Sequence, residues 1–234
     1  MVWAARWATL LLLAVAADMF AQSPSAVSLA KKVDAHYNHL HSLEARYTER
    51  YQGMGMDRTE SGTLTLEKPG RMRWAYDMPA GKVFILDGTN AISYTPGDAE
   101  ATRFPEKKLD DLRSPLRFLL GHTELEKELR GLSVTLVNLD GQTGYTLWGT
   151  PVGIPPLRAE ERSQGTPGIE QRVRSIGVTV DAAGMIHILR IEETDGAITT
   201  FTFSDMHENV PITDGEFRFI PPDGVTVIDG AAPV

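Results

Sequence analysis

The strongest constraint on the fold is a single change in the spacing of apolar residues. In the N-terminal part, Leu29, Val33, Tyr37 and Leu40 recur at intervals of four, four and three residues. This spacing is typical of one apolar face of an amphipathic helix of about four turns. From Leu43 onward the period is two, which indicates strands with one buried face. The chain is therefore predicted to begin with one helix and to continue mainly as β-sheet.

The alternating segments continue almost to the C-terminus and are separated by sequences that favour tight turns. Turn signals include Asp87-Gly88, Ala183-Gly184 and Asp195-Gly196, which suit two-residue hairpin loops. We predict about ten antiparallel strands in meander order. They include residues 64–66, 71–76, 83–86, 91–94, 101–104, 133–138, 144–150, 172–181, 185–193, 198–203, 217–219 and 225–228.

Helical signals interrupt this series in the middle of the chain. Ser114-Pro115 is typical of a helix start, and Gly121 of a helix end, so residues 114–121 are predicted as a helix. A second short helix is predicted at residues 124–130, and the Pro- and Gly-rich residues 151–171 are predicted as a long loop. The result is an α+β fold, mostly antiparallel β, in which helices cover the concave face of one curved sheet.

The N-terminus has the order of features found in secretory signal peptides. Arg6 precedes an apolar run at residues 8–17, and small residues follow. We expect residues 1–21 to be a signal peptide cleaved after Ala17 or Ala21, and residues 22–234 to form a single domain. A short membrane anchor is the alternative, although the run is shorter than the about 20 residues that span a bilayer.

Composition excludes several classes of protein. The chain has no cysteine, so it has neither disulfides nor the cysteine to which a bacterial lipid anchor is attached. Its formal net charge is −8, which disfavours binding to nucleic acid. An exported chain of this composition must be held together by its apolar core alone.

Three segments follow one another in a recognisable order and spacing. Residues 62–79 are GTLTLEKPGRMRWAYDMP, residues 86–96 are LDGTNAISYTP, and residues 217–227 are FRFIPPDGVTV. Together with residues 43–47 and Ser114-Pro115-Leu116, they resemble the LolA family of periplasmic outer-membrane lipoprotein carriers. In that family a strand leads into a basic residue, a proline and then a tryptophan, an Asp-Gly turn precedes a tyrosine, and the chain ends in an FxFxPPxGV segment.

The resemblance implies an incomplete, strongly curved β-barrel with a helical lid over its concave hydrophobic face. It implies a monomeric periplasmic carrier without a cofactor, which holds the acyl chains of lipoproteins between sheet and lid. The partners it implies are acylated lipoproteins, the inner-membrane Lol ABC transporter that loads the carrier, and an outer-membrane acceptor similar to LolB. LolB shares the fold but is itself a lipoprotein, and the absence of cysteine argues against that identity here. A lipid- or lipoprotein-sensing module on the same fold is the alternative function.

The resemblance also implies two sets of site residues. The acyl cavity is expected to be lined by Leu64, Leu66, Met72, Trp74, Tyr76, Leu116 and Leu119. Alternatively, Met72, Trp74 and Tyr76 fill a closed core, which is what an apolar stripe usually does. Lys68 stands where the family commonly has an arginine that holds the lid shut, so the lid latch is expected at Lys68 or at Arg71 or Arg73. A solvated strand-end charge is the alternative for Lys68.

Motifs for catalysis and metal binding are weak. His36 and His39 could share a helix face as zinc ligands, but no cysteine helps and solvated histidines are the simpler interpretation. Asp110-Asp111 is explained by acids at a helix start, and the chain has neither a GxSxG turn nor a phosphate-binding glycine loop. We therefore expect no enzyme activity, no metal and no cofactor, with a secreted hydrolase as the competing class.

Overall fold

The structure is a computed structural model, and it describes residues 23–106, 123–152 and 173–230. The predicted signal peptide, the predicted helix at residues 114–121 with Leu116 and Leu119, and nearly all of the predicted loop lie outside these residues. Within the described part of the chain, no helix is long and apolar enough to cross a membrane.

Helix α1 (Ala26–His39) forms where the spacing of apolar residues predicts it. The side chain of Ser25 caps its first turn by accepting a hydrogen bond from the backbone N–H of Ser28 at 3.1 Å. Its buried residues are Leu29, Ala30, Val33 and Tyr37. The helix therefore presents one apolar face, which is the face predicted from the sequence.

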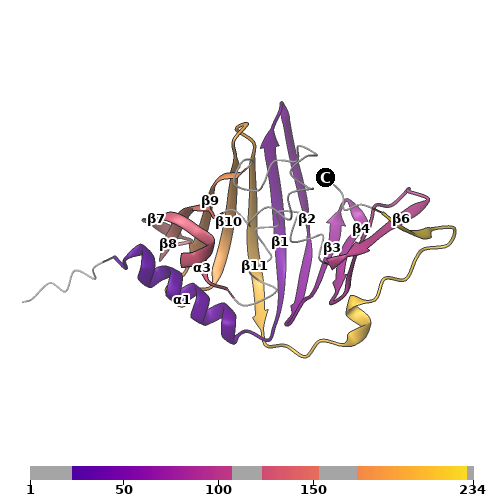
Figure 1. Ribbon diagram of the computed structural model, residues 1–234, viewed down its shortest axis with the longest axis horizontal. Coiled ribbons are helices and arrows are strands. Elements are labelled where there is room, and N and C mark those ends of the chain that lie inside the picture. The colour runs from indigo at the N-terminus through magenta and orange to yellow at the C-terminus, as the bar shows by residue number, and fades with distance from the viewer. Residues whose placement is uncertain (1–22, 107–122, 153–172, 231–234) are drawn as a thin grey trace, which may run out of the picture.

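In the described ranges, twelve strands form one sheet, in the order β12-β6-β5-β4-β3-β2-β1-β11-β10-β9-β8-β7. Figure 1 shows the long β1 and β2 in the centre, with the two halves of the sheet on either side. The strands are β1 (Ser42–Gly53), β2 (Met56–Glu67), β3 (Arg71–Met78), β4 (Ala80–Asp87), β5 (Asn90–Tyr94), β6 (Glu100–Pro105), β7 (Leu129–Leu139), β8 (Gln142–Pro151), β9 (Val173–Val180), β10 (Ile186–Glu193), β11 (Ile198–Glu208) and β12 (Thr226–Asp229).

The order of the strands is that of two meanders rather than the single one predicted. Strands β1 to β6 form the first and β7 to β11 the second. They are joined by the antiparallel pairing of β1 with β11, in which Tyr47 lies opposite Phe203. The pairing of β12 with β6 is parallel, while the other pairs are antiparallel. The predicted class is confirmed: the described part of the chain is mostly antiparallel, and its single sheet is unclosed and accompanied by few helices.

Helices cover the half of the sheet that contains β7 and β8. Helix α3 (Leu125–Glu128) packs against α1, and both contact β7. The carboxylate of Asp34 accepts a hydrogen bond from the backbone N–H of Leu125 at 3.1 Å, and Asn38 forms hydrogen bonds with Thr123. Polar residues of α1 therefore fix the start of α3, while the apolar residues of α1 face the sheet.

Two predicted elements are wrong in detail. The helix predicted at residues 124–130 ends at Glu128, because Leu129 and Arg130 pair with β8 as the first residues of β7. The strand predicted at residues 217–219 is absent: Phe217 ends the 3-10 helix η3 (Asp214–Phe217). In place of a neighbouring strand, η3 is held by arginine side chains of β3.

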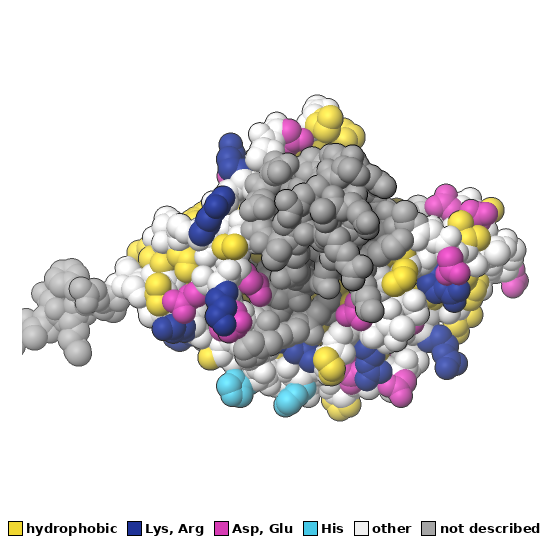
Figure 2. Space-filling model, viewed as in Figure 1, with side chains coloured by type: hydrophobic (Ala, Val, Ile, Leu, Met, Phe, Trp, Pro, Cys, Tyr) yellow, Lys and Arg dark blue, Asp and Glu magenta, His cyan; other side chains and the backbone are white. Residues whose placement is uncertain are grey.

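Charged side chains of both signs lie on the described surface. On the face shown in Figure 2, lysine and arginine side chains are interspersed with acidic ones.

Candidate functional site

The site is built on the side of the sheet that shares its core with α1, which we call the inner face. Period-two alternation brings the side chains of Leu64, Leu66, Met72 and Trp74 to this face, and each is at most 4% exposed. Tyr76 is half-buried and packs against the same core. The five predicted cavity residues of β2 and β3 therefore lie together, whereas Leu116 and Leu119 lie outside the described residues.

Aromatic rings occupy the middle of the inner face. The ring of Tyr47 lies edge-on to Trp74 and to Tyr76, with centroids 4.5 Å and 5.6 Å apart. Phe201 of β11 approaches Trp74 to 5.6 Å. The rings thus continue the apolar surface across the junction of the two meanders.

Gly62 makes this close packing possible. It lies between Tyr47 and Tyr76 in the sheet, opposite both of them. A Cβ atom at Gly62 would lie 2.0 Å from the backbone oxygen of Ala75, so no other residue fits without movement of the backbone.

Beyond the aromatic rings, the inner face ends in charged residues. Glu49 of β1 and Glu60 of β2 lie directly opposite each other. The ammonium of Lys82 lies 2.6 Å from Glu60 Oε2 and 4.2 Å from the centroid of the Tyr76 ring. Glu60 is only 5% exposed. The inner face therefore changes from aliphatic to aromatic to charged along β1 and β2.

Burial perturbs the titratable groups at this end. Burial, together with the neighbouring charge of Glu60, raises the pKa of the Glu49 carboxyl. Burial likewise raises the pKa values of Tyr47 and Tyr76, so both remain neutral phenols. The buried hydroxyl of Tyr47 forms no hydrogen bond within the described residues.

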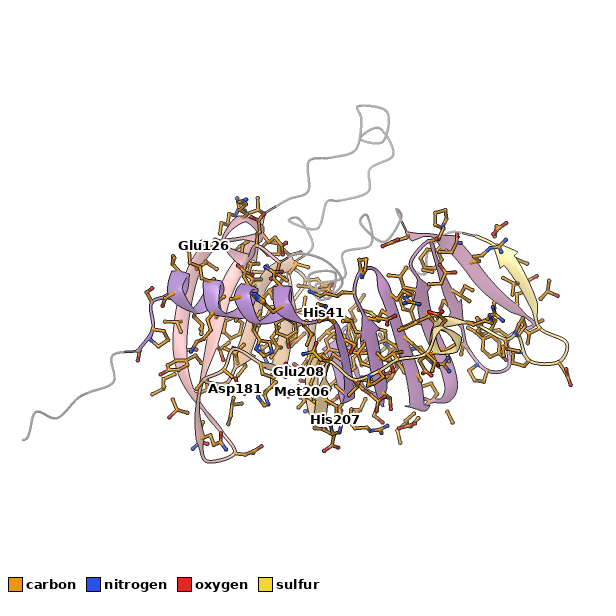
Figure 3. The ribbon with its side chains drawn as sticks, turned by 90° about the horizontal axis from the view of Figure 1, so that it is seen from below. His41, Glu126, Asp181, Met206, His207 and Glu208 are labelled. Atoms are coloured by element: carbon orange, nitrogen blue, oxygen red, sulfur yellow. The ribbon has the colours of Figure 1, made fainter. Side chains whose placement is uncertain are left out.

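The C-terminal end of α1 is fixed to the sheet by three polar contacts. Lys68 donates a hydrogen bond to the backbone oxygen of Tyr37 at 2.6 Å, and burial lowers the pKa of Lys68. The hydroxyl of Tyr37 accepts from the backbone N–H of Ile186 at 3.1 Å. His36 pairs with Glu208, which lies at the end of β11 near α1 in Figure 3.

The predicted latch residues thus hold two different segments. Lys68 binds the last turn of α1, a contact that suits the negative end of a helix dipole. Arg71 binds Asp214 at 2.6 Å and covers the ring of Phe217, and Arg73 donates to the backbone oxygen of Glu216 at 3.0 Å. Arg71 and Arg73 therefore fasten η3, and the lid helix expected at residues 114–121 lies outside the described residues.

The charged end of the inner face was missed by the sequence prediction. Its signal is the register of β1, in which Glu49 follows Ala45 and Tyr47 at alternate positions and so shares their face. In the described residues, no group of three or more histidines and acidic residues could hold a metal. His39, one of the histidines considered as zinc ligands, contacts the backbone oxygen of Ala35 at 2.6 Å.

Comparison with known proteins gives a consistent result. The sequence profile of the family described as outer membrane lipoprotein carrier protein LolA matches residues 38–140. An outer-membrane lipoprotein carrier protein of Ralstonia nicotianae is 30% identical over 172 residues, which are 73% of this chain and 69% of that protein. One from Nitrosomonas europaea is 24% identical over 209 residues, covering 88% and 91% of the two chains.

Among solved structures, an uncharacterized conserved protein of Thermus thermophilus has a similar fold. It aligns with a TM-score of 0.51 at 11% sequence identity, over 88% of this chain and 99% of that one. This likeness concerns the fold alone.

Proposed function

Because this chain belongs to the LolA family of outer-membrane lipoprotein carrier proteins, we propose that it carries lipoproteins by binding their acyl chains against the inner face of its sheet. The observation that carries the proposal is the continuous apolar cluster on the inner face formed by Leu64, Leu66, Met72 and Trp74, which the aromatic rings extend to β11. In this proposal the protein acts in the periplasm as a monomer, without enzyme activity.

The physical requirement on such a carrier is severe. An acyl chain of about 16 carbons exposes CH₂ groups that cost about 0.8 kcal/mol each in water, on the order of 10 kcal/mol in total. The carrier must cover this surface during transit and give it up at the target membrane. Adaptable side chains such as Met72, whose sulfur lies 2.8 Å from the indole nitrogen of Trp74, suit chains of varying shape.

The remaining parts of the proposal concern partners and the lid. We propose that an inner-membrane Lol ABC transporter loads the carrier and that a LolB-like acceptor receives the lipoprotein at the outer membrane. Leu116 and Leu119 are proposed to complete the cavity. Lys68, with Arg71, is proposed as the latch, and the contact of Lys68 with the last turn of α1 supports a role in holding a helix over the sheet.

Native mass spectrometry of the protein purified from the cell envelope, together with lipid extraction, tests the carrier function. We expect an added mass of acylated protein or lipid, which is lost in Leu66→Lys. The matched control is Leu136→Lys, because Leu136 lies on β7 with 64% of its surface exposed.

Circular dichroism separates loss of binding from loss of the fold. Trp74→Leu provides a second variant that perturbs the core less than a buried lysine does. A folded wild-type protein that carries no lipid and takes up no fluorescent fatty acid would contradict the proposal. In that case the apolar inner face is a closed core.

A further inference from the structure

We propose that the charged end of the inner face, formed by Glu49, Glu60, Lys82 and the hydroxyl of Tyr47, binds the ammonium group of an acylated ligand. This inference rests on the proposed function, since the acyl chains must lie along the apolar part of the same face. Two kinds of ligand share this chemistry. One is a diacylated lipoprotein with a free α-amine on its N-terminal cysteine, and the other is a phospholipid with an ethanolamine headgroup.

The first argument is the absence, across the described ranges, of a direct ion pair at Glu49. Glu49 and Glu60 lie opposite each other, and the cations near them pair with Glu60. Within the described residues, neither a cation nor a hydrogen-bond donor contacts the carboxylate of Glu49. A half-buried carboxylate beside a second one is unfavourable without a counter-ion. Lys82 and Arg58 balance the two carboxylates in number, but both pair with Glu60, so the carboxylate of Glu49 lacks a direct ion-pair partner within the described residues.

The second argument is the unpartnered hydroxyl of Tyr47. The residue is 2% exposed, and its hydroxyl has no hydrogen-bond partner in the described part of the chain. It lies in the same region, because Tyr47 and Glu49 share one face of β1 and the ring of Tyr47 is edge-on to that of Tyr76 at 5.6 Å. A hydroxyl and a carboxylate both accept hydrogen bonds, and an ammonium provides three donors. The nearby ring of Tyr76, which already faces Lys82 at 4.2 Å, shows that this region accommodates a cation against an aromatic face.

The third argument is position. The six steps from Glu60 to Leu66 span about 20 Å of strand, at about 3.3 Å per residue, and the side chains of Leu64 and Leu66 share the inner face with Glu60. An amphiphile whose acyl chain lies on Leu64 and Leu66 can therefore have its head at Glu49 and Glu60. Acylation of the amine would remove the positive charge, so this end of the face distinguishes a free amine from an amide.

Two synthetic lipopeptides test the inference. Both carry an S-diacylglyceryl cysteine, one with a free α-amine and the other with an acetylated one, and both displace a fluorescent fatty acid from the purified protein. Wild type should bind the free amine about tenfold more tightly, as expected for a hydrogen bond to a charged group. In Glu49→Gln this ratio should fall to about twofold or less, and Tyr47→Phe should reduce it as well. Glu44→Gln, on the exposed side of the same strand, should leave the ratio unchanged.

The arms of the experiment separate the possible outcomes. Vesicles of phosphatidylethanolamine and of its N-acetylated form, used as competitors, tell whether the ammonium of a phospholipid is recognised in addition to that of a lipopeptide. Equal affinity of wild type for the two lipopeptides would overturn the inference and leave the carrier function intact. Failure of the folded protein to bind either lipopeptide or the fatty acid would contradict the carrier function itself.

Discussion

The ion pair between Lys82 and Glu60 allows a quantitative test of how the inner face tolerates charge. Lys82→Met keeps the aliphatic stem and removes the ammonium that lies 2.6 Å from Glu60. At an effective dielectric constant of 20, the attraction at this distance is about 6 kcal/mol before desolvation is subtracted. Removing one partner of a buried pair typically costs about 3–5 kcal/mol. Because Arg58 lies 3.6 Å from the same carboxylate, we expect a loss of about 3 kcal/mol in the free energy of unfolding.

Removal of the other partner, by Glu60→Gln, should lower the free energy of unfolding by less. The Lys82 side chain is 24% exposed and that of Glu60 only 7%, so a lysine without its partner can reach water while a glutamate cannot. We expect Glu60→Gln to cost about 1 kcal/mol and the double variant about 2 kcal/mol, which gives a coupling energy of about 2 kcal/mol. Urea denaturation followed by tryptophan fluorescence measures all three values.

A pair of the same length on the surface provides the control. Lys127 lies 2.6 Å from Glu124, but their side chains are 73% and 46% exposed. Lys127→Met should therefore cost no more than about 0.5 kcal/mol. The reasoning is refuted if the two lysine variants lose the same stability, or if the effects of Lys82→Met and Glu60→Gln are simply additive.

Three further variants test other features. Gly62→Ala should lose about 3 kcal/mol in the free energy of unfolding, because the new Cβ meets a backbone oxygen at 2.0 Å. Gly215→Ala is the control and should change thermal stability little, because the nearest atom to its new Cβ lies at 3.9 Å. Equal melting temperatures of the two variants would contradict this expectation. Tyr37→Phe leaves the backbone N–H of Ile186 without the hydroxyl that accepts its hydrogen bond. The variant should therefore lose about 1–3 kcal/mol in the free energy of unfolding and exchange hydrogen faster at that amide. An unchanged exchange rate would contradict this role of the Tyr37 hydroxyl. Burial opposes ionisation of Asp181, but hydrogen bonds from His187 and from the backbone N–H groups of Met185 and Ala183 outweigh it and lower its pKa. The carboxylate therefore stabilises the fold above the unfolded pKa of about 3.9 and loses this effect as the pH falls through the lower folded value, so the stability gap between wild type and Asp181→Asn should narrow between pH 7 and pH 3 in urea titrations; a constant gap would refute this account.

The local features of the fold could be predicted because they depend on periodicity within one element. The spacing of Leu29, Val33 and Tyr37 predicts both α1 and its buried face, and alternation places Leu64 and Trp74 on one side of the sheet. Long-range pairing could not be predicted in this way. Nothing in β1 itself specifies β11 as its neighbour, and a four-residue strand such as β12 carries too short a pattern to show that it pairs parallel to β6.

The candidate site was predicted only in its apolar part. A stripe of apolar residues reveals itself in a sequence, while an inward-facing charge is indistinguishable from a surface charge until its register is known. Glu60 and Lys82 belong to strands that are not neighbours, and only the hairpins of β2, β3 and β4 bring them together. The partner of Lys68 was likewise unpredictable, because the backbone oxygen of Tyr37 lies 31 residues away in the sequence.

The two unpaired ends of the sheet affect how far its curvature can change. In a closed barrel, strand number and stagger fix the diameter, and any widening must break a ladder of hydrogen bonds. Here, among the residues that the structure describes, β7 and β12 are the two ends of the strand order and are not joined to each other. The curvature of the sheet can therefore relax or tighten while every strand keeps its hydrogen-bonded neighbours. Under the proposed carrier function, the space for a ligand is therefore set by how side chains pack rather than by how many strands there are, and one sheet serves ligands of different bulk.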